Sequence, residues 1–248
     1  MTAVASETPK PVREQGTSPA PARLTSLDAY RGLVMLLMMA EALDLSRVAQ
    51  AVPGSALWKF LAHHQSHAEW IGCSLHDLIQ PSFSFLVGVA LPFSLASRAA
   101  RGQSRTFMTL HEVRWLATTG VVCLAAGGAL GWLGVCPIVK RIWTPSWTLF
   151  SGGWCLVLMA GFYLLLDLWG RKRWSFPLVV IGTNSIAAYC IAALGGNFIG
   201  MSLRTHLAPS VFKLFGRPYE PLLYGGFIVI VMWLLLYWIY RRKLFLRI

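Results

Sequence analysis

Four of the six histidines fall within residues 63–83, which read HHQSHAEWIGCSLHDLIQPSF. Glu69 and Asp77 lie in the same segment. An imidazole changes charge near neutral pH, so a histidine oriented by a carboxylate such as Asp77 could act as a general base or a nucleophile. His63 and His67, four residues apart with Glu69 nearby, also form a mixture of ligands that transition metals favour. Catalysis, metal binding and a solvated loop without a chemical role therefore all remain open at this point.

The sequence around this segment is that of a membrane protein. The chain has 248 residues, of which 56% are hydrophobic and 13% charged, and its mean hydropathy is positive. A helix needs about 20 mostly apolar residues to cross a bilayer. Six stretches approach that length: 28–46, 77–97, 115–135, 147–169, 176–200 and 221–240. Because these stretches lack the alternation of barrel strands, we predict an all-α, polytopic helical bundle with about six transmembrane helices.

The basic residues indicate topology rather than a nucleic-acid partner. The net charge is +12, but Lys and Arg flank the apolar stretches instead of forming one solvated face. With the N-terminus in the cytoplasm, 15 of the 22 Lys and Arg residues lie on the inner side. Both termini are then cytoplasmic, and residues 47–76 lie outside with the histidines. Residues 1–23, rich in Pro, Ala, Thr and Ser, are predicted to be a disordered cytoplasmic tail before a membrane domain at 24–248.

Several small residues are explained by helix packing alone. The five cysteines form no close pairs, so the sequence predicts neither a disulfide framework nor a zinc site. Gly127 and Gly131 have the GxxxG spacing that lets a membrane helix pack closely against a neighbour.

Polar residues within or at the ends of the spans are functional candidates, since hydrocarbon makes them costly. Asn184 lies inside the fifth predicted span. Asp28 and Arg31, three residues apart, could simply pair at the membrane interface. Asp167, at the end of a predicted helix, could be a solvated residue.

Separate motifs then follow one another in a recognisable order. They are RLTSLDAYRGLVMLLMMAE, HAEWIGCSLHDLIQPSFSFLVGVALPFSL, KRIWTPSWTLFSGG, FYLLLD, GTNSIAAY and YRRKLFLRI. In these motifs the chain resembles the membrane acyltransferase family typified by heparan-alpha-glucosaminide N-acetyltransferase, which includes bacterial relatives. The resemblance covers about residues 23–98 and 130–248.

The resemblance implies an enzyme of the bacterial inner membrane that moves acetyl from cytoplasmic acetyl-CoA to an extracytoplasmic carbohydrate or amino-sugar acceptor. The family's catalytic histidine falls on His67, and Asp77 matches the aspartate that follows it. Asn184 and Ser185 match the family's Asn-Ser pair. No metal is expected.

Acetyl-CoA would be bound as a co-substrate by residues nearer the cytoplasm. Its phosphates are polyanionic and should stay near inner arginines such as Arg31 and Arg98. The thin pantetheine arm could then pass Asn184 between helices. His67 could remove a proton from the acceptor amine or carry the acetyl group itself.

The chain departs from the family pattern in the middle. Only one predicted helix, 115–135, stands where family members carry several, with a join near residues 106–114. The absent helices would help to wall the CoA site, so we expect weak transfer from a monomer unless a homo-oligomer supplies that wall. Two alternatives follow: a non-catalytic or degenerate transport or assembly subunit, and an extracytoplasmic metal-binding protein using His63, His67 and Glu69.

Overall fold

The computed structural model describes residues 24–88 and 105–244, with side chains in the second range from residue 110. Within these ranges every regular element is helical, which confirms the all-α prediction. The predicted tail 1–23, Arg98 and residues 89–97 of the second predicted span lie outside the described residues. The main helices are α1 (Thr25–Met39), α2 (Leu45–Ala51), α3 (Ala56–Gln65), α4 (Ile79–Gly88), α6 (Arg105–Trp132), α7 (Pro145–Phe162), α8 (Phe176–Gly182), α9 (Ser185–Cys190), α10 (Gly196–His206) and α11 (Glu220–Arg241).

Short 3-10 and π-helical turns link or extend these helices. The 3-10 turns are η1 (Ala40–Leu43), η2 (His76–Leu78), η5 (Val211–Lys213) and η6 (Arg217–Tyr219), and the π-helical turns are η3 (Tyr163–Leu168) and η4 (Ile191–Gly195). The predicted join near 106–114 lies inside α6, which continues without a break to Trp132.

Four described segments are long and apolar enough to cross a membrane: Leu110–Trp132, Pro145–Leu168, Ser185–His206 and Arg217–Arg241. Three correspond to the predicted spans 115–135, 147–169 and 221–240. The fifth prediction, 176–200, is displaced, because α8 ends at Gly182 and the span-length segment begins at Ser185. The first predicted span holds three charged residues in α1 and η1. These findings are those of a helical membrane protein.

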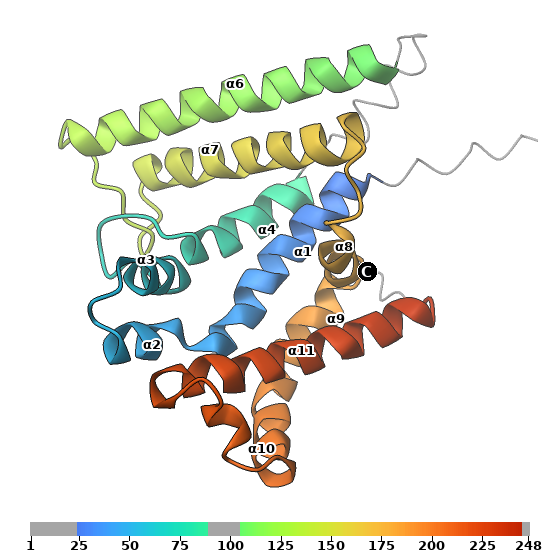
Figure 1. The fold of residues 1–248 in the computed structure, drawn as a ribbon. Coiled ribbons are helices and arrows are strands. Elements are labelled where there is room, and N and C mark those ends of the chain that lie inside the picture. The colour runs from blue at the N-terminus through green and yellow to red at the C-terminus, as the bar shows by residue number, and fades with distance from the viewer. Residues whose placement is uncertain (1–23, 89–104, 245–248) are drawn as a thin grey trace, which may run out of the picture.

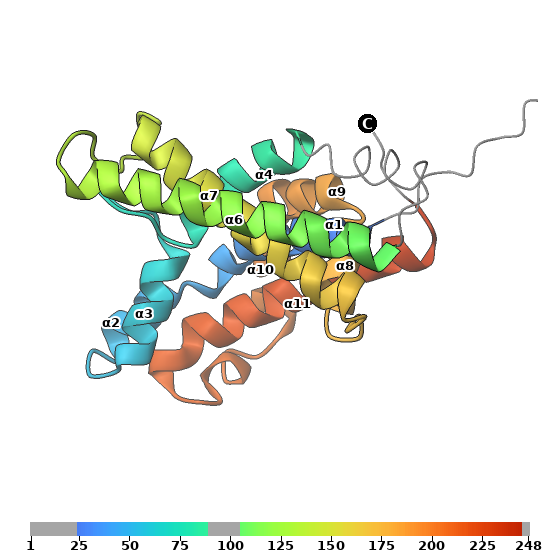
Figure 2. The ribbon, with the colours of Figure 1, turned by 90° about the horizontal axis from the view of Figure 1, so that it is seen from above.

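The long helices run between two ends of the molecule (Figure 1). One end holds α2, α3 and the loop 133–144, and we name it the histidine end because α3 and the histidine segment lie there. The other end holds the N-terminus of α1 and the C-terminal end of α11, and we name it the terminal end. Figure 1 shows α6 alongside α7, and seen from above α6 lies over α7, against which it packs (Figure 2).

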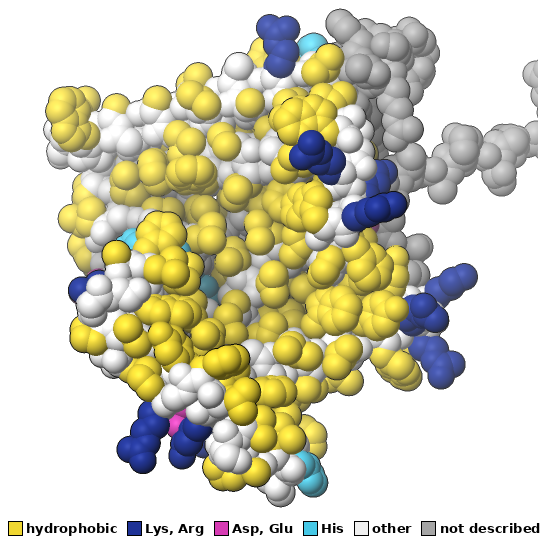
Figure 3. All heavy atoms as spheres, viewed as in Figure 1, with side chains coloured by type: hydrophobic (Ala, Val, Ile, Leu, Met, Phe, Trp, Pro, Cys, Tyr) yellow, Lys and Arg dark blue, Asp and Glu magenta, His cyan; other side chains and the backbone are white. Residues whose placement is uncertain are grey.

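Helix α1 lies at the centre of the core. One face packs on α7 and η3 in a cluster that includes Tyr30, Met159 and Leu166. Its other face joins α8, α9 and α11 in a second cluster that includes Met35 and Met232. Apolar side chains cover most of the visible surface between the two ends (Figure 3), as expected of a surface in contact with lipid.

Asp167 has a structural role that the sequence did not indicate. Its Oδ2 accepts a hydrogen bond of 3.3 Å from the backbone N–H of Ser26 in the first turn of α1. A carboxylate satisfies the free donors of a helix N-terminus and suits its dipole. Asp167 therefore fixes the start of α1 to the end of η3, and is more than a solvated charge.

Glycines allow the closest helix contacts. A Cβ at Gly127 would lie 2.7 Å from the Phe150 N and the Ser146 O of α7, which confirms the predicted close packing at this glycine. A Cβ at Gly131 would instead meet Ile138 of the following loop at 3.0 Å. Between α1 and α8 the approach is tighter still: a Cβ at Gly182 would lie 1.7 Å from the Asp28 carbonyl oxygen.

We therefore expect Gly182→Ala to destabilise the protein strongly. The added methyl meets backbone rather than a movable side chain, and overpacking of this kind typically costs about 1–3 kcal/mol or more. Thermal unfolding in detergent measures the effect. Gly161→Ala is the matched control, because a Cβ there meets nothing within 4 Å. An equal change in both variants would contradict the close α1–α8 contact.

Candidate active site

Asp77 is the fixed centre of the polar cluster at the histidine end. It lies in η2, just before α4, and its side chain is fully buried at 0% exposure. Its Oδ2 accepts hydrogen bonds of 3.0 Å from the backbone N–H of Ala68, the backbone N–H of Ser74 and the Ser74 hydroxyl. The Asp77 N–H in turn donates to Ser74 Oγ at 3.2 Å. This exchange is a capping box. It ties residues 66–75, the loop between α3 and η2 that we name the histidine loop, to the start of α4.

His67 is held by the other oxygen of the same carboxylate. Its Nδ1 lies 2.8 Å from Asp77 Oδ1. Because an ionised carboxylate only accepts hydrogen bonds, this contact places a proton on Nδ1 and leaves the lone pair on Nε2. The His67 side chain is 61% exposed. The pair therefore presents an oriented basic nitrogen to a ligand at the surface of the site.

Lys140 completes the cluster from a distant part of the chain. Its Nζ, in the loop between α6 and α7, donates to Asp77 Oδ1 at 3.0 Å and lies 3.1 Å from His67 Nδ1. Since Nδ1 carries the proton, the hydrogen bond of the ammonium goes to the carboxylate. The side chain is 20% exposed, so its charge is only partly screened. Lys140 thus neutralises Asp77 beside the histidine.

The loop that carries Lys140 is anchored by Thr144. Thr144 is the N-cap of α7, and its Oγ1 accepts hydrogen bonds from the N–H of Trp147 at 3.3 Å and of Val139 at 3.1 Å. Its hydroxyl donates to the Pro137 carbonyl at 2.8 Å. The Gly72 N–H donates to the Ile138 carbonyl at 3.0 Å, which joins this loop to the histidine loop. These bonds fix the position from which Lys140 reaches Asp77.

A second histidine–carboxylate pair lies beside the first. His76 Nε2 is 2.8 Å from Glu41 Oε1 at the end of α1, and the His67 and His76 rings are 4.7 Å apart. His76 is only 4% exposed. Its buried Nδ1 has no hydrogen-bond partner among the described residues. His76 therefore belongs to the site, although the sequence motifs assigned it no role.

The electrostatics of the cluster favour a charged Asp77 and the neutral forms of His76 and Cys73. Burial alone would raise the pKa of Asp77, but the N–H groups of Ala68 and Ser74, with His67 and Lys140, hold it well below its usual range. Burial lowers the pKa of His76, although Glu41 opposes that effect. Burial, followed by the charge of Asp77, raises the pKa of Cys73 to about 12. Cys73 is therefore a poor nucleophile at neutral pH.

The residues predicted to bind the co-substrate lie elsewhere. The hydrogen bonds of the His67–Asp77 pair involve none of them. Asn184 is buried at the N-cap of α9, Ser185 is the first residue of that helix, and Arg31 is half-buried on α1. The structure thus joins His67 and Asp77 and keeps Asn184, Ser185 and Arg31 apart from them, while Arg98 lies outside the described residues.

A cavity of about 690 Å³ opens at the terminal end of the molecule. It lies where the start of α1, the turn after α8 and the end of α11 meet. Its walls are formed by Thr25, Asp28, Val179, Thr183, Tyr240, Arg241 and Lys243. Thr183 directly precedes Asn184, but neither Asn184 nor Ser185 is among the residues that line this cavity.

The geometry gives the metal-binding alternative no support. Within the part of the chain that the structure describes, no three His, Cys, Asp or Glu side chains are grouped to hold a metal ion. All five cysteines are unpaired.

The chain was also compared with known proteins. No family model matches it. Heparan-alpha-glucosaminide N-acetyltransferase of Homo sapiens is 30% identical over 118 residues, which cover 46% of this chain and 16% of the human protein. The chain is a distant relative of a membrane N-acetyltransferase. The match spans less than a fifth of the human protein, and the apolar helices are those of a membrane protein.

Lys140 and Ser74 were not identified as site residues from sequence, and Glu41 was indicated only as a polar residue at the outer end of the first predicted span. Ser74 carried a readable signal, because Ser-x-x-Asp before an apolar run is typical of a capping box. Lys140 is the first residue of the KRIWTPSW motif, but the charge pattern indicated only that it lies on the outer side of the membrane. Glu41 lies 35 positions from its partner His76, a separation at which sequence spacing predicts no contact.

Proposed function

We propose that this protein is a membrane-embedded acyltransferase that moves acetyl from cytoplasmic acetyl-CoA to an amino-sugar-type acceptor on the opposite side of a bacterial inner membrane. The observation that carries the proposal is the His67–Asp77 pair, in which the carboxylate holds Nδ1 of an exposed imidazole and leaves Nε2 outside that hydrogen bond, at the histidine end. The terminal end then faces the cytoplasm, and the acceptor approaches His67 from outside.

In direct transfer, His67 acts as a general base. Nε2 takes a proton from the acceptor amine while the amine nitrogen attacks the thioester carbonyl. The new C–N bond forms and the C–S bond breaks. The CoA thiolate then takes the proton back from the imidazolium. The negative charge of Asp77, 2.8 Å from Nδ1, stabilises the imidazolium in this step.

In covalent transfer, Nε2 itself attacks the thioester carbonyl and the C–S bond breaks, which leaves an acetyl-imidazolium and a CoA thiolate. The acceptor amine then attacks the acetyl carbon, the C–N(imidazole) bond breaks, and the released thiolate accepts the amine proton. Both routes need Nδ1 to remain held by Asp77. They differ in whether acetyl is ever bonded to the protein.

The test is transfer from radiolabelled acetyl-CoA to glucosamine by the purified protein in nanodiscs. Label on glucosamine supports the proposal, and transient label on His67 in the absence of acceptor selects the covalent route. We expect the activity to accompany a homo-oligomer, since a second copy can supply a wall for the CoA site. Absence of transfer from both monomer and oligomer would overturn the proposal. Robust turnover by a demonstrated monomer would contradict the need for association.

The proposed orientation predicts which residues are accessible from each compartment. Cysteine introduced at exposed Gln50 should react with a membrane-impermeant thiol reagent added to intact spheroplasts. Cysteine at exposed Lys172, between η3 and α8, should react only after the membrane is opened. Native Cys73 is a poor reporter because its pKa is raised to about 12. The reverse pattern would place His67 in the wrong compartment.

A further inference from the structure

The cavity at the terminal end is built from three segments that are far apart in sequence. Thr25 and Asp28 come from the first motif, Thr183 from GTNSIAAY, and Arg241 and Lys243 from the last motif. Figure 3 shows Lys and Arg side chains gathered along this edge, next to a mostly apolar face. Three of the motifs on which the family resemblance was based thus meet at a place remote from His67.

The chemistry of the walls fits a phosphorylated ligand. Arg241 and Lys243 supply positive charge, and guanidinium and ammonium groups are the usual partners of phosphate. Thr25 adds a hydroxyl group that can donate a hydrogen bond, whereas the Thr183 hydroxyl donates to the Val180 carbonyl at 2.9 Å and offers a ligand its lone pairs. Thr25 is also the first residue of α1, whose N-terminal dipole favours an anion.

Two further side chains favour a nucleotide over a bare phosphate. Asp28 is a buried carboxylate, 5% exposed, that would repel phosphate but can accept hydrogen bonds from ribose hydroxyl or adenine amino groups. Tyr240 gives the cavity an aromatic wall on which a base can stack. A volume of about 690 Å³ is within the range of small-molecule sites.

We propose that this cavity binds the phosphorylated nucleotide end of acetyl-CoA. The inference rests on the proposed function and replaces the predicted phosphate site at Arg31 and Arg98 with Arg241 and Lys243. Helix α1 connects the cavity to the catalytic end: Asp28 and Glu41 are separated by about 20 Å at 1.5 Å per residue. Glu41 contacts His76, whose ring meets the His67 ring edge-on.

Polar groups are also buried between α1, α4 and α7. Two residues beyond Asp28 on α1, the Tyr30 hydroxyl is hydrogen-bonded to Ser82 Oγ at 2.9 Å, and Ser82 Oγ lies 3.5 Å from Cys155 Sγ. A narrow, elongated pantetheine arm that leaves the cavity toward His67 needs such amide-compatible partners, because its own amides cannot lie unsatisfied among apolar side chains.

The experiment measures binding of unlabelled CoA and of pantetheine by titration calorimetry on the nanodisc-embedded protein. The variant Arg241→Gln/Lys243→Gln should bind CoA about tenfold or more weakly, the usual loss when charged hydrogen bonds to phosphate are removed. Its affinity for pantetheine, which lacks the nucleotide, should equal that of the wild type. Wild-type CoA affinity should also fall as salt is raised.

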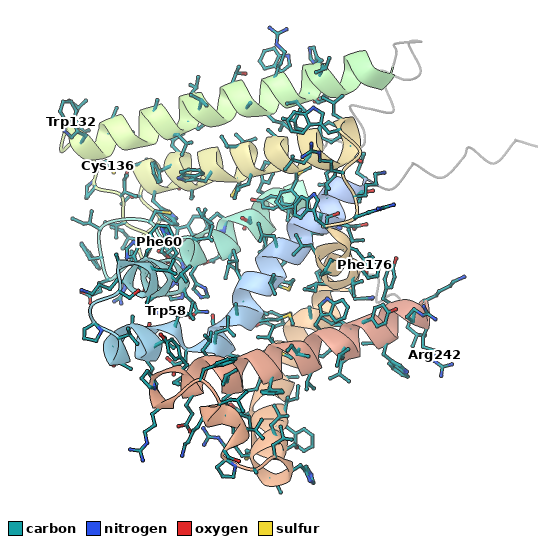
Figure 4. All side chains as sticks on the ribbon, viewed as in Figure 1. Trp58, Phe60, Trp132, Cys136, Phe176 and Arg242 are labelled. Carbon is teal, nitrogen blue, oxygen red and sulfur yellow. The ribbon has the colours of Figure 1, made fainter. Side chains whose placement is uncertain are left out.

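Arg242→Gln is the matched control. Arg242 follows Arg241 directly but lies over the Trp238 ring at 5.8 Å, outside the cavity walls, and Figure 4 places it at the end of α11. Its CoA affinity should be unchanged. His67→Ala should also bind CoA normally, since it lies at the other end.

Two outcomes overturn the assignment. One is equal CoA affinity in the wild type and the double variant. The other is tight, Arg241-dependent binding of short-chain phosphatidylglycerol without any binding of CoA, which would make the cavity a lipid headgroup site. CoA binding that depends on Arg241, in a protein that transfers no acetyl, would instead count against the proposed function and leave the nucleotide site standing.

Discussion

His67→Ala should lower acetyl transfer to glucosamine by about 10²–10⁴-fold, the usual contribution of a general base, and by more if His67 carries the acetyl group. Thermal stability should change little, because the side chain is 61% exposed and supports little packing. The measurement is the initial rate with labelled acetyl-CoA at equal protein concentration, together with thermal unfolding. A variant that is inactive but folded separates a chemical role from a structural one.

His63→Ala is the control for this experiment. His63 is exposed on α3, its ring lies 5.2 Å from that of His64, and it takes no part in the hydrogen bonds of Asp77. Its loss should change the rate by less than about twofold, within the range of ordinary surface substitutions. Wild-type rates in His67→Ala combined with loss of activity in His63→Ala would contradict the assignment of His67.

The membrane fold was predictable because each span leaves a continuous apolar run in the sequence. The residues at which each helix begins and ends were less certain. The break at Thr183 and Asn184 interrupts a stretch that is apolar on both sides, and Asn184 adopts a non-helical φ of −130° that hydropathy does not reveal. Helices α2 and α3 were expected as an outer loop, although Ser55 caps α3 through a bond of 3.5 Å to the Trp58 N–H.

The site residues that belong to a sequence motif could be predicted. Those brought into the site by tertiary packing could not. The contact between His67 and Asp77 followed from the family pattern, since a spacing of ten residues does not by itself bring two side chains together. Lys140 reaches Asp77 across 63 positions, through a loop whose course depends on Thr144 and on the α6–α7 contact. Only tertiary structure fixes such a partner.

Asp77→Asn should reduce both stability and activity, with a rate between those of the wild type and His67→Ala. The substitution keeps the shape but removes the charge that Lys140 pairs with, and breaking a buried pair costs about 3–5 kcal/mol. It also turns one acceptor oxygen into a donor, which conflicts with the N–H groups of Ala68 and Ser74 or with His67 and Lys140. Thermal unfolding and transfer rate at pH 7 measure both effects.

The pH dependence of stability shows whether Asp77 acts through its charge or through its shape. The pKa of Asp77 is lowered in the folded protein, so its ionisation contributes stability that is complete above the ordinary aspartate pKa of about 3.9. That contribution is lost as the pH falls through the lower, folded-state pKa. The difference in unfolding temperature between wild type and Asp77→Asn should therefore stay constant from pH 7 to about 5 and shrink below about 4. A difference that persists undiminished to pH 2 would mean that Asp77 acts through packing and hydrogen-bond geometry, and that its charge does not hold His67 in place.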